Sequence, residues 1–311
     1  MQKDAHDMKT SITEIAAGVH QMVVGEGAHE GVYAPNVYLA LGSERAAIID
    51  TAYGKDAEVD YYLAQWRAMG SPEIAAIVLT HRHGDHIGGA NRLREATGGA
   101  VICSCLEQEA IESEQSSARA PDEPFQRMAD ENDDEGDYGT EGVSVDATVK
   151  DGDTLELGDA TLEFIHTPGH TLGSLSILHR QTGVLFSGDM ILGTGTTVIS
   201  PDHGDMAAYI ESMRKMKGFD SRMIAPGHGP MIHTPQDKLN EMITRRFARE
   251  EQIVKLVEAG NRSLDTLLDA IYAGKIHPQL MDTARSQIRA HLIKLQAEGR
   301  VSDIDGQDEQ D

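Results

Sequence analysis

Residues 80–89 read THRHGDHIGG, and this stretch decides the fold that we expect for the chain. It follows IAAIVLT (74–80), an apolar, β-branched run typical of a buried strand. Within six positions the stretch carries His81, His83, Asp85 and His86. Imidazole and carboxylate groups are the ligands that zinc and related divalent ions bind. So many such groups at one strand end are unfavourable unless an ion binds them. The stretch therefore predicts a metal site.

The spacing within this stretch predicts that it serves two ions. In an extended segment, His81, His83 and Asp85 point to one side and His86 points to the other. Glycines at positions 84, 88 and 89 leave room where the backbone turns beside the ions. One short loop can therefore supply ligands to two neighbouring sites.

Three later segments carry side chains of the same kind at strand ends. They are HTPGHTLGS (166–174) with His170, LFSGDMILG (185–193) with Asp189, and APGHGP (225–230) with His228. A single histidine or aspartate in a glycine turn usually belongs to the turn alone. Four such segments in one chain, however, form a coherent set of metal ligands.

Three further histidines stay outside this set. His166 lies four residues before His170, His203 lies in SPDHGD (200–205), and His233 follows His228 by five residues. We interpret each as a surface or turn residue. Of the three, His203 is a candidate to face a substrate, and the loop 194–197 is another.

Strand-forming runs and helical segments alternate over the first 230 residues. Strands are predicted at 36–42, 46–51, 74–80, 100–104, 154–167, 174–180, 184–189 and 223–227. The segments 57–70 and 89–98 are predicted to be helices that end at glycine. Strands and helices in this order predict a layered α/β (α+β) architecture.

Two segments depart from this alternation. Residues 113–152 include the acidic run DENDDEGD and show no periodicity, which predicts a mobile insertion, with a lid over the active face as the alternative. From residue 236 onward we predict three helices, with Ser263 as the N-cap of the second, and then a short strand at 300–304. The expected domains are therefore a catalytic domain at 1–235 and a helical, winged-helix-like domain with an acidic tail at 236–311.

The formal net charge of −24 is unevenly distributed along the 311 residues. Residues 1–236 hold 37 acidic and 16 basic side chains, whereas residues 237–300 hold 9 and 11. An acidic domain repels polyanions at long range, which disfavours general nucleic-acid binding. No apolar run of about 18 residues predicts a membrane span, and residues 1–18 lack the apolar centre of a signal peptide, so we expect a cytoplasmic protein.

The two cysteines, Cys103 and Cys105, lie two residues apart in an expected strand. Side chains so spaced point the same way along a strand, which is a poor geometry for a disulfide between them. We interpret them as small, partly buried strand residues and not as a redox or metal pair.

The motifs THRHGDHIGG, HTPGHTLGS, LFSGD and PGHG, in this order over roughly residues 30–235, resemble those of the metallo-β-lactamase superfamily. The resemblance implies a four-layer αββα sandwich. It implies that one ion binds His81, His83 and His170, that a second ion binds Asp85, His86 and His228, and that Asp189 bridges the two. Asp50, in IIDTAYG, matches the family's first acidic position and is implied to support the loop 81–86.

A narrower resemblance joins GDMILGTGTT (188–197), the segment 226–253 and the terminal helices to the β-lactamase-like protein 2 group. In that group a winged-helix module follows the catalytic domain, and some members are endoribonucleases. The commonest zinc β-lactamases place a cysteine in the metal shell where this chain has Asp189, which disfavours antibiotic hydrolysis. Glyoxalase II enzymes share the ligands but differ in the segment that follows this aspartate.

The ligand set implies a hydrolytic mechanism. Five neutral imidazoles and two carboxylates around two dications leave a formal charge of +2, and a bound metal lowers the pKa of water to about 7. We expect a hydroxide that bridges the ions to attack directly, with Asp85 and Asp189 as the catalytic carboxylates and Asp85 taking up or relaying a proton. Zinc is the expected metal, and manganese or iron fits the same nitrogen and oxygen ligands.

Three functions compete on these grounds. The first is hydrolysis of a small ester, thioester or lactone, which fits the acidic catalytic domain. The second is cleavage of single-stranded RNA, for which the support is a set of basic residues interleaved with acids, interpreted as a solvated helix face: Arg245, Arg246, Arg249, Arg285, Arg289 and Lys294. The third is a metal-bound binding module without catalysis.

The expected partner is a small-molecule substrate and not a membrane, and the sequence leaves the oligomeric state open. Residues 29–36, 113–150 and 194–204 are the expected walls of the substrate pocket.

Overall fold

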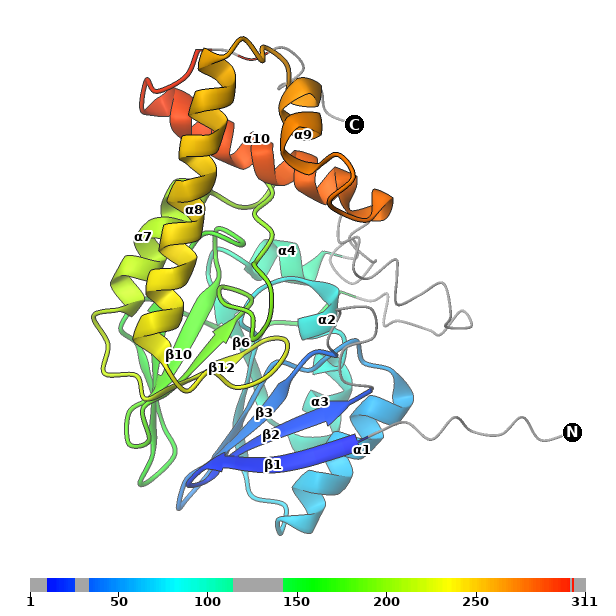
Figure 1. Cartoon of the computed structure of the whole chain (residues 1–311). Helices are drawn as coiled ribbons and strands as arrows, with labels where there is room; N and C mark the ends of the chain where they lie inside the picture. The colour runs from blue at the N-terminus through cyan, green and yellow to red at the C-terminus, as the bar shows by residue number, and fades with distance from the viewer. Residues whose placement is uncertain (1–9, 26–33, 114–141, 303, 305–311) are drawn as a thin grey trace, which may run out of the picture.

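Two β-sheets lie face to face at the centre of the computed structural model, which describes residues 10–25, 34–113, 142–302 and 304 (Figure 1). The first sheet contains seven strands in chain order: β1 (Thr10–Ala16), β2 (Val19–Val24), β3 (Val37–Leu41), β4 (Ala46–Ile49), β5 (Ile74–Val78), β6 (Ala100–Ser104) and β7 (Ala147–Val149). The pairs from β1 to β4 are antiparallel, and those from β4 to β7 are parallel.

The second sheet contains five strands in the order β12-β11-β10-β9-β8. They are β8 (Thr154–Glu156), β9 (Thr161–His166), β10 (Leu175–His179), β11 (Val184–Gly188) and β12 (Met223–Pro226). The first four pair antiparallel, and β12 lies parallel to β11. The segment 154–167, predicted as one strand, is a hairpin because residues 157–160 form the turn between β8 and β9.

Successive apolar side chains along a strand point to opposite faces of its sheet, which explains how the sheets and helices stack in layers. In β3, Val37 and Leu39 face the core beneath the helices of the first sheet, whereas Tyr38 and Ala40 face the second sheet. The ring of Tyr38 packs on Phe186 of β11, with centroids 5.0 Å apart. Both faces of the central strands are buried, which is why these strands appear in the sequence as continuous apolar runs.

Helices cover the outer face of each sheet. Helices α1 (Asp56–Ala68) and α3 (Ala90–Thr97) bury residues such as Val59 and Leu93 against the first sheet. Helices α7 (Met206–Met216) and α8 (Pro235–Glu258) bury Tyr209 and Leu239 against the second. The fold is therefore the αββα sandwich that the family resemblance implies.

The last helices pack around a separate core (Figure 1). The distal part of α8 joins α9 (Leu264–Tyr272), the short 3-10 helix η1 (Pro278–Leu280) and α10 (Met281–Ala297). Ser263 accepts a hydrogen bond from the backbone N–H of Thr266, so it caps α9 as predicted. Among the described residues, no helix combines the length and the apolar character needed to cross a bilayer.

Several elements differ from the sequence-based expectations. Residues 300–302 and Ile304 form no strand, so the prediction of a strand at 300–304 is wrong for the described part of that segment. Strand β7 lies within 113–152, where no regular element was expected, and it is held to the first sheet by pairing with β6. The centre of the predicted insertion, 114–141, lies outside the described residues. The strands β1 and β2 and the helix α7 were not predicted.

Candidate metal centre

The candidate ligands all lie in loops at the ends of strands, along one edge of the two sheets. Asp50 follows β4 and His81 follows β5, while Asp189 and His228 follow the parallel strands β11 and β12. His170 lies in the loop between β9 and β10. Because parallel strands end at the same edge of a sheet, the fold brings these side chains together although they are as far as 178 positions apart.

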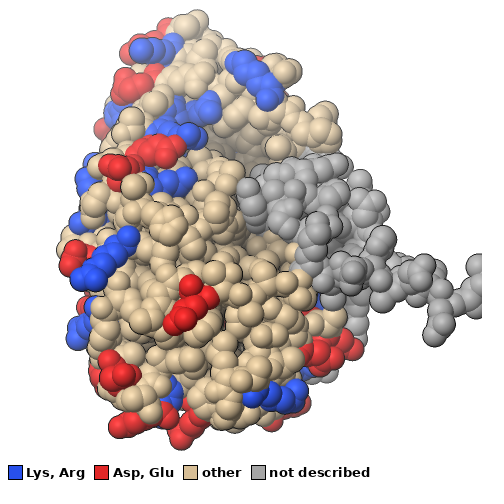
Figure 2. Space-filling model, turned by 60° about the horizontal axis from the view of Figure 1, so that its bottom comes forward, with Lys and Arg blue, Asp and Glu red and all other residues tan. Residues whose placement is uncertain are grey.

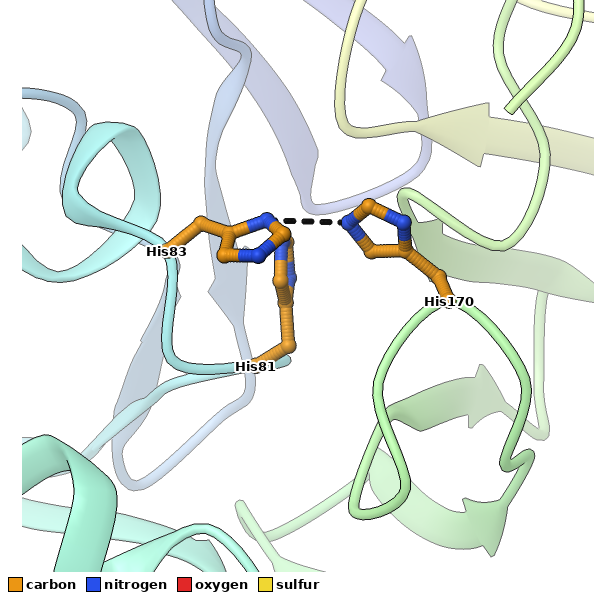
Figure 3. Close-up of side chains that lie close together, drawn as sticks. All are labelled: His81, His83 and His170. Atoms are coloured by element: carbon orange, nitrogen blue, oxygen red, sulfur yellow. Dashed lines mark hydrogen bonds between the residues drawn. The ribbon is translucent and has the colours of Figure 1, made fainter. Parts of the chain in front are cut away.

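The first group is a three-histidine cluster made of His81, His83 and His170 (Figure 3). Nδ1 of His83 lies 3.1 Å from Nε2 of His81 and 2.9 Å from Nε2 of His170. All three side chains are buried, and their ligand atoms lie within 4.8 Å of one another. This cluster can hold one cation.

The second group is a histidine–carboxylate cluster made of Asp85, His86, Asp189 and His228. Nε2 of His228 lies 3.0 Å from Oδ2 of Asp85 and 3.5 Å from Oδ2 of Asp189, and it lies 3.2 Å from Nε2 of His86. Asp189 also joins His81 and His86 in a set of ligand atoms within 4.8 Å, so it lies between the two clusters. The division is the one that the family resemblance implies.

The backbone of this loop differs from the extended conformation that we expected. His83 is extended, but helix α2 (Gly84–Ile87) begins at the next residue. Asp85 and His86 therefore lie on the first turn of a helix, and the expected alternation fails beyond His83. The helical turn directs these two side chains to the second cluster, which an extended strand would not do.

Acceptors outside the clusters orient three of the histidines. The Thr80 hydroxyl donates to Oδ2 of Asp50 at 2.9 Å, so it accepts from Nδ1 of His81, 3.0 Å away. Nδ1 of His86 donates to Asp50 at 2.8 Å, and Nδ1 of His170 donates to the carbonyl of Val198 at 2.8 Å. With Nδ1 held in this way, Nε2 of each ring faces its cluster.

Of these orienting groups, Asp50 was singled out in the sequence. It also accepts a hydrogen bond from the backbone N–H of Thr80 at 2.8 Å, which ties β4 to the start of the ligand loop. Thr80 and the carbonyl of Val198 were missed. Thr80 was visible as the first residue of THRHGDHIGG, whereas a backbone carbonyl leaves no trace in the sequence.

Electrostatics differ between the two clusters. Burial, and then neighbouring histidines, hold the pKa values of His81 and His83 well below the usual value, so both are neutral near pH 7. Burial would also lower the pKa of His228, but Asp189 and Asp85 raise it to about 9. The same carboxylates raise the pKa of His86 despite its burial. Burial alone would raise the pKa of Asp189, but His228 and His86 hold it below its usual value.

Several observations show that the donor set fits divalent ions. Three imidazole nitrogens converge at about 3 Å in the first cluster, and their lone pairs repel one another unless a cation or shared protons separate them. Oδ1 of Asp189 is buried and has no hydrogen-bond partner among the described residues. An added Cβ on Gly227 would lie 2.2 Å from this oxygen and 2.9 Å from Cε1 of His86, so only glycine leaves this space open.

Among the described histidines outside the predicted set, His203 has ring contacts with the three-histidine cluster. Its ring centroid is 5.2 Å from that of His83 and 6.5 Å from that of His170. Burial, and then His170, lower the pKa of His203 to about 4, so the ring is neutral near pH 7. Nε2 of His166 donates to the carbonyl of Leu172 at 2.9 Å, and His233 is exposed.

Both cysteines are free, as expected, and neither lies in the clusters. Cys103 is buried in β6. Cys105 lies beyond the end of that strand and is exposed, so its assignment as a strand residue was wrong.

Two family models match this chain. One, described as the metallo-beta-lactamase superfamily, matches residues 31–228. The other, described as the beta-lactamase associated winged helix domain, matches residues 263–309. The first match includes every candidate ligand.

Individual relatives agree with these matches. A beta-lactamase-like protein 2 homolog from Caenorhabditis elegans is 32% identical over 72% of this chain, which spans 65% of that relative's length. An atrochrysone carboxyl ACP thioesterase from Aspergillus fumigatus is 28% identical over 76% of this chain and 63% of its own length. A solved structure of a metallo-beta-lactamase family protein from Thermus thermophilus has a TM-score of 0.70 and 21% identity, covering 92% of this chain and 95% of that chain.

Because the superfamily model matches more than half of the chain, the chain belongs to the metallo-beta-lactamase superfamily of hydrolases, and it carries a beta-lactamase associated winged helix domain.

Proposed function

We propose that this protein hydrolyses a small ester, thioester or lactone at a centre of two divalent ions, with zinc as the best-fitting metal. The observation that carries the proposal is the convergence of seven candidate ligand side chains at the edge of the sandwich. Among them, Oδ1 of Asp189 has no hydrogen-bond partner among the described residues and lies 3.5 Å from Nε2 of His86. Imidazole and carboxylate ligands without a cysteine suit zinc and also accommodate manganese or iron.

The three-histidine cluster would hold one ion and the histidine–carboxylate cluster the other, with Asp189 between them. Bound divalent ions would supply a lowered pKa for water and polarisation of a carbonyl oxygen. The chain itself keeps the ligands in place, because Asp50 and the Val198 carbonyl hold the rings of His86 and His170 in the required tautomers. Asp85, 3.0 Å from Nε2 of His228, is placed to exchange a proton at its Oδ2.

Two findings support a small acyl substrate. A relative that is 28% identical is named an atrochrysone carboxyl ACP thioesterase, which supports a thioester among the candidate substrates. The formal net charge of −24 opposes binding of a polyanion. Figure 2 shows lysine and arginine side chains interspersed with acidic ones on the visible face, without a continuous basic band.

Ion pairs within the C-terminal helices argue against the RNA alternative. Arg245 pairs with Glu241 at 2.7 Å, and Arg285 pairs with Asp265 at 2.6 Å. Lys294 is buried and pairs with Glu250 at 2.9 Å. Arg246 is also buried, so the expectation that all six basic residues lie on a solvated face was wrong. Few of these cations are free to bind phosphates along a strand.

The test is a metal analysis of the purified protein combined with a substrate panel. The panel contains a fluorogenic ester, an acyl thioester, a lactone and a single-stranded RNA. We expect turnover of at least one acyl substrate, loss of that turnover after chelation, and its return when zinc, manganese or iron is added. Cleavage of the RNA with no acyl turnover would contradict the proposal and show that the protein hydrolyses phosphodiesters.

Two variants control this experiment. His83→Ala removes a ligand atom that lies about 3 Å from two other imidazoles, so it should abolish turnover. His233→Ala removes an exposed histidine five residues after His228 in the chain and should leave turnover unchanged. Turnover that survives chelation, or equal turnover in the two variants, would contradict a metal-dependent mechanism.

A further inference from the structure

A cavity of about 470 Å³ lies between the C-terminal helices and the loop that follows β11. Its walls come from α8, α9, α10 and the loop residues Thr196 and Val198. None of the seven candidate metal ligands lines it. The cavity is therefore a separate site, formed where the winged helix domain meets the sandwich.

Several polar atoms in the walls of this cavity have no hydrogen-bond partner among the described residues. The Arg246 side chain is 5% exposed and His291 is 1% exposed. Nε of Arg246 and both ring nitrogens of His291 lack partners, and so do Nε2 of Gln287 and the hydroxyl of Thr283. Nδ1 of His291 lies 3.7 Å from Oε1 of Glu250, which is beyond hydrogen-bond distance. Buried polar atoms left unpaired in this way destabilise a protein, and a rotation of their side chains toward a ligand in the cavity would give them partners.

The charge in this cavity is positive. Arg246 and Arg249 both line it, and neither forms an ion pair with any residue in the described part of the chain. Arg249 donates to Oε1 of Gln252 at 2.9 Å and lies over the ring of Tyr272, 4.8 Å from its centroid. Arg246 lies over Tyr209 at 4.8 Å. Two arginines that keep their charge uncompensated in a chain of net charge −24 favour an anion.

The rest of the wall is apolar. Val198, Tyr272, Ile276, Leu280 and Ala284 contribute carbon surface in addition to the two arginines. A bare inorganic ion would leave this surface without contacts, whereas an aromatic or aliphatic group would cover it. The cavity thus has one end for an oxyanion and one side for a hydrocarbon.

Short hydrogen bonds connect the cavity to the metal centre. Nη2 of Arg246 donates to the carbonyl of Thr197 at 2.6 Å, and the hydroxyl of Thr197 donates to the carbonyl of Asp189 at 2.7 Å. The next residue, Val198, accepts from His170. Oε1 of Gln287 accepts a hydrogen bond from the backbone N–H of Ile199 at 2.9 Å. One loop therefore contacts both sites.

We propose that this cavity binds a small organic anion in which one carboxylate or phosphate group is attached to an apolar body. The anionic group pairs with Arg246 and Arg249. Gln287 and Thr283, which line the cavity, donate to it after their side chains rotate. The apolar body lies against Tyr272, Ile276 and Leu280. Binding does not depend on hydrolysis, because the site contains none of the metal ligands.

Calorimetric titration of the full chain tests this site with four probes: phenyl phosphate, benzoate, inorganic phosphate and the neutral benzamide. Titrations use metal-loaded protein and protein freed of metal by chelation followed by dialysis. We expect phenyl phosphate or benzoate to bind both forms, at least about tenfold more tightly than inorganic phosphate or benzamide. The probe that binds better identifies the anionic group.

Two variants locate the binding. Arg249→Gln removes one charge from the wall of the cavity and should lower the affinity for the probe roughly tenfold. Ala248→Trp places a large ring on a wall position and should block the cavity while leaving both guanidinium groups in place. Arg222→Gln, which removes an exposed charge from the sandwich, is the matched control and should change nothing.

Failure of both aromatic anions to bind either form of the wild-type protein would overturn the proposal. Equal binding by wild type, Arg249→Gln and Ala248→Trp would overturn it too, because the probe would then occupy another site. Binding that requires the metals would place the probe at the metal centre. If the metal-free chain is unfolded by circular dichroism, the variants are compared in the metal-loaded form, where the same differences decide. None of these outcomes depends on substrate turnover, so the proposed hydrolysis is tested separately.

Discussion

The three-histidine cluster and the histidine–carboxylate cluster draw ligands from the same short loop, yet they differ in charge. Burial keeps His81 and His83 neutral, so their lone pairs are available to a cation near pH 7. In the second cluster, Asp85 and Asp189 raise the pKa of His228 to about 9, so this histidine carries a proton that an ion must displace. Carboxylates beside a histidine thus favour the binding of a metal ion and at the same time make that binding dependent on pH.

The largest effect should come from Asp189, which belongs to the histidine–carboxylate cluster and also lies within 4.8 Å of a ligand atom of His81 in the three-histidine cluster. Asp189→Ala removes the carboxylate between them, so we expect turnover to fall roughly 10³-fold or more and the metal content to drop for both ions. His170→Ala removes a ligand of the first cluster alone and should leave the second ion bound. Elemental analysis and kcat/KM measure the two effects. Equal metal content in the two variants would mean that Asp189 does not join the clusters.

A smaller effect is expected at Asp50, which contacts only the second cluster directly. In Asp50→Asn the amide can present an N–H to Nδ1 of His86 in place of an oxygen, and this disturbs the tautomer that exposes Nε2. We expect the affinity of the second ion to fall about 10- to 100-fold, while the first ion is held nearly as before. Competition with a chromophoric chelator measures both affinities. A larger loss at the first ion would reverse the assignment.

The pH dependence of metal binding should separate the clusters further. Below about pH 9, binding at the second cluster displaces the proton of His228 and also that of His86, whose pKa the same carboxylates raise, so its apparent affinity should rise about tenfold per pH unit for each proton displaced. The affinity of the first cluster should stay flat near neutral pH, because the lowered pKa values of His81 and His83 leave no proton to displace. Calorimetry in buffers of different ionisation enthalpy counts the protons released, and His228→Ala should release about one fewer at the second site.

The smallest effect is expected at His203, whose ring packs on His83 without entering either ligand set. His203→Ala should leave the metal content unchanged and alter kcat/KM by less than about tenfold, since it removes a wall contact and no ligand. Loss of an ion in this variant would make His203 a ligand and enlarge the first cluster.

The strands that carry ligands were predictable because their faces are apolar and their ends are marked by glycine. The runs that became β3, β5 and β12 lie within the predicted ranges, and Ser263 caps α9 as its position before an apolar run indicated. The strands β1 and β2 were not predicted, because their polar residues, such as Thr13 and Gln21, dilute the alternation. Strand β7 is only three residues long and depends on pairing with β6, so no local pattern marks it.

Four glycine-rich strand ends in the sequence offer imidazole and carboxylate groups and little else, so the residue types that can bind a metal are visible before folding. How these groups divide into two clusters depends on the folded chain. The turn of α2 at Gly84 directs His86 away from His83, and the parallel pairing of β11 with β12 brings Asp189 to His228. The physical reason is that the charge on a histidine is set by burial and by neighbours in space. Asp189 and His228 are 39 positions apart in the chain, and their atoms meet at 3.5 Å only in the folded protein.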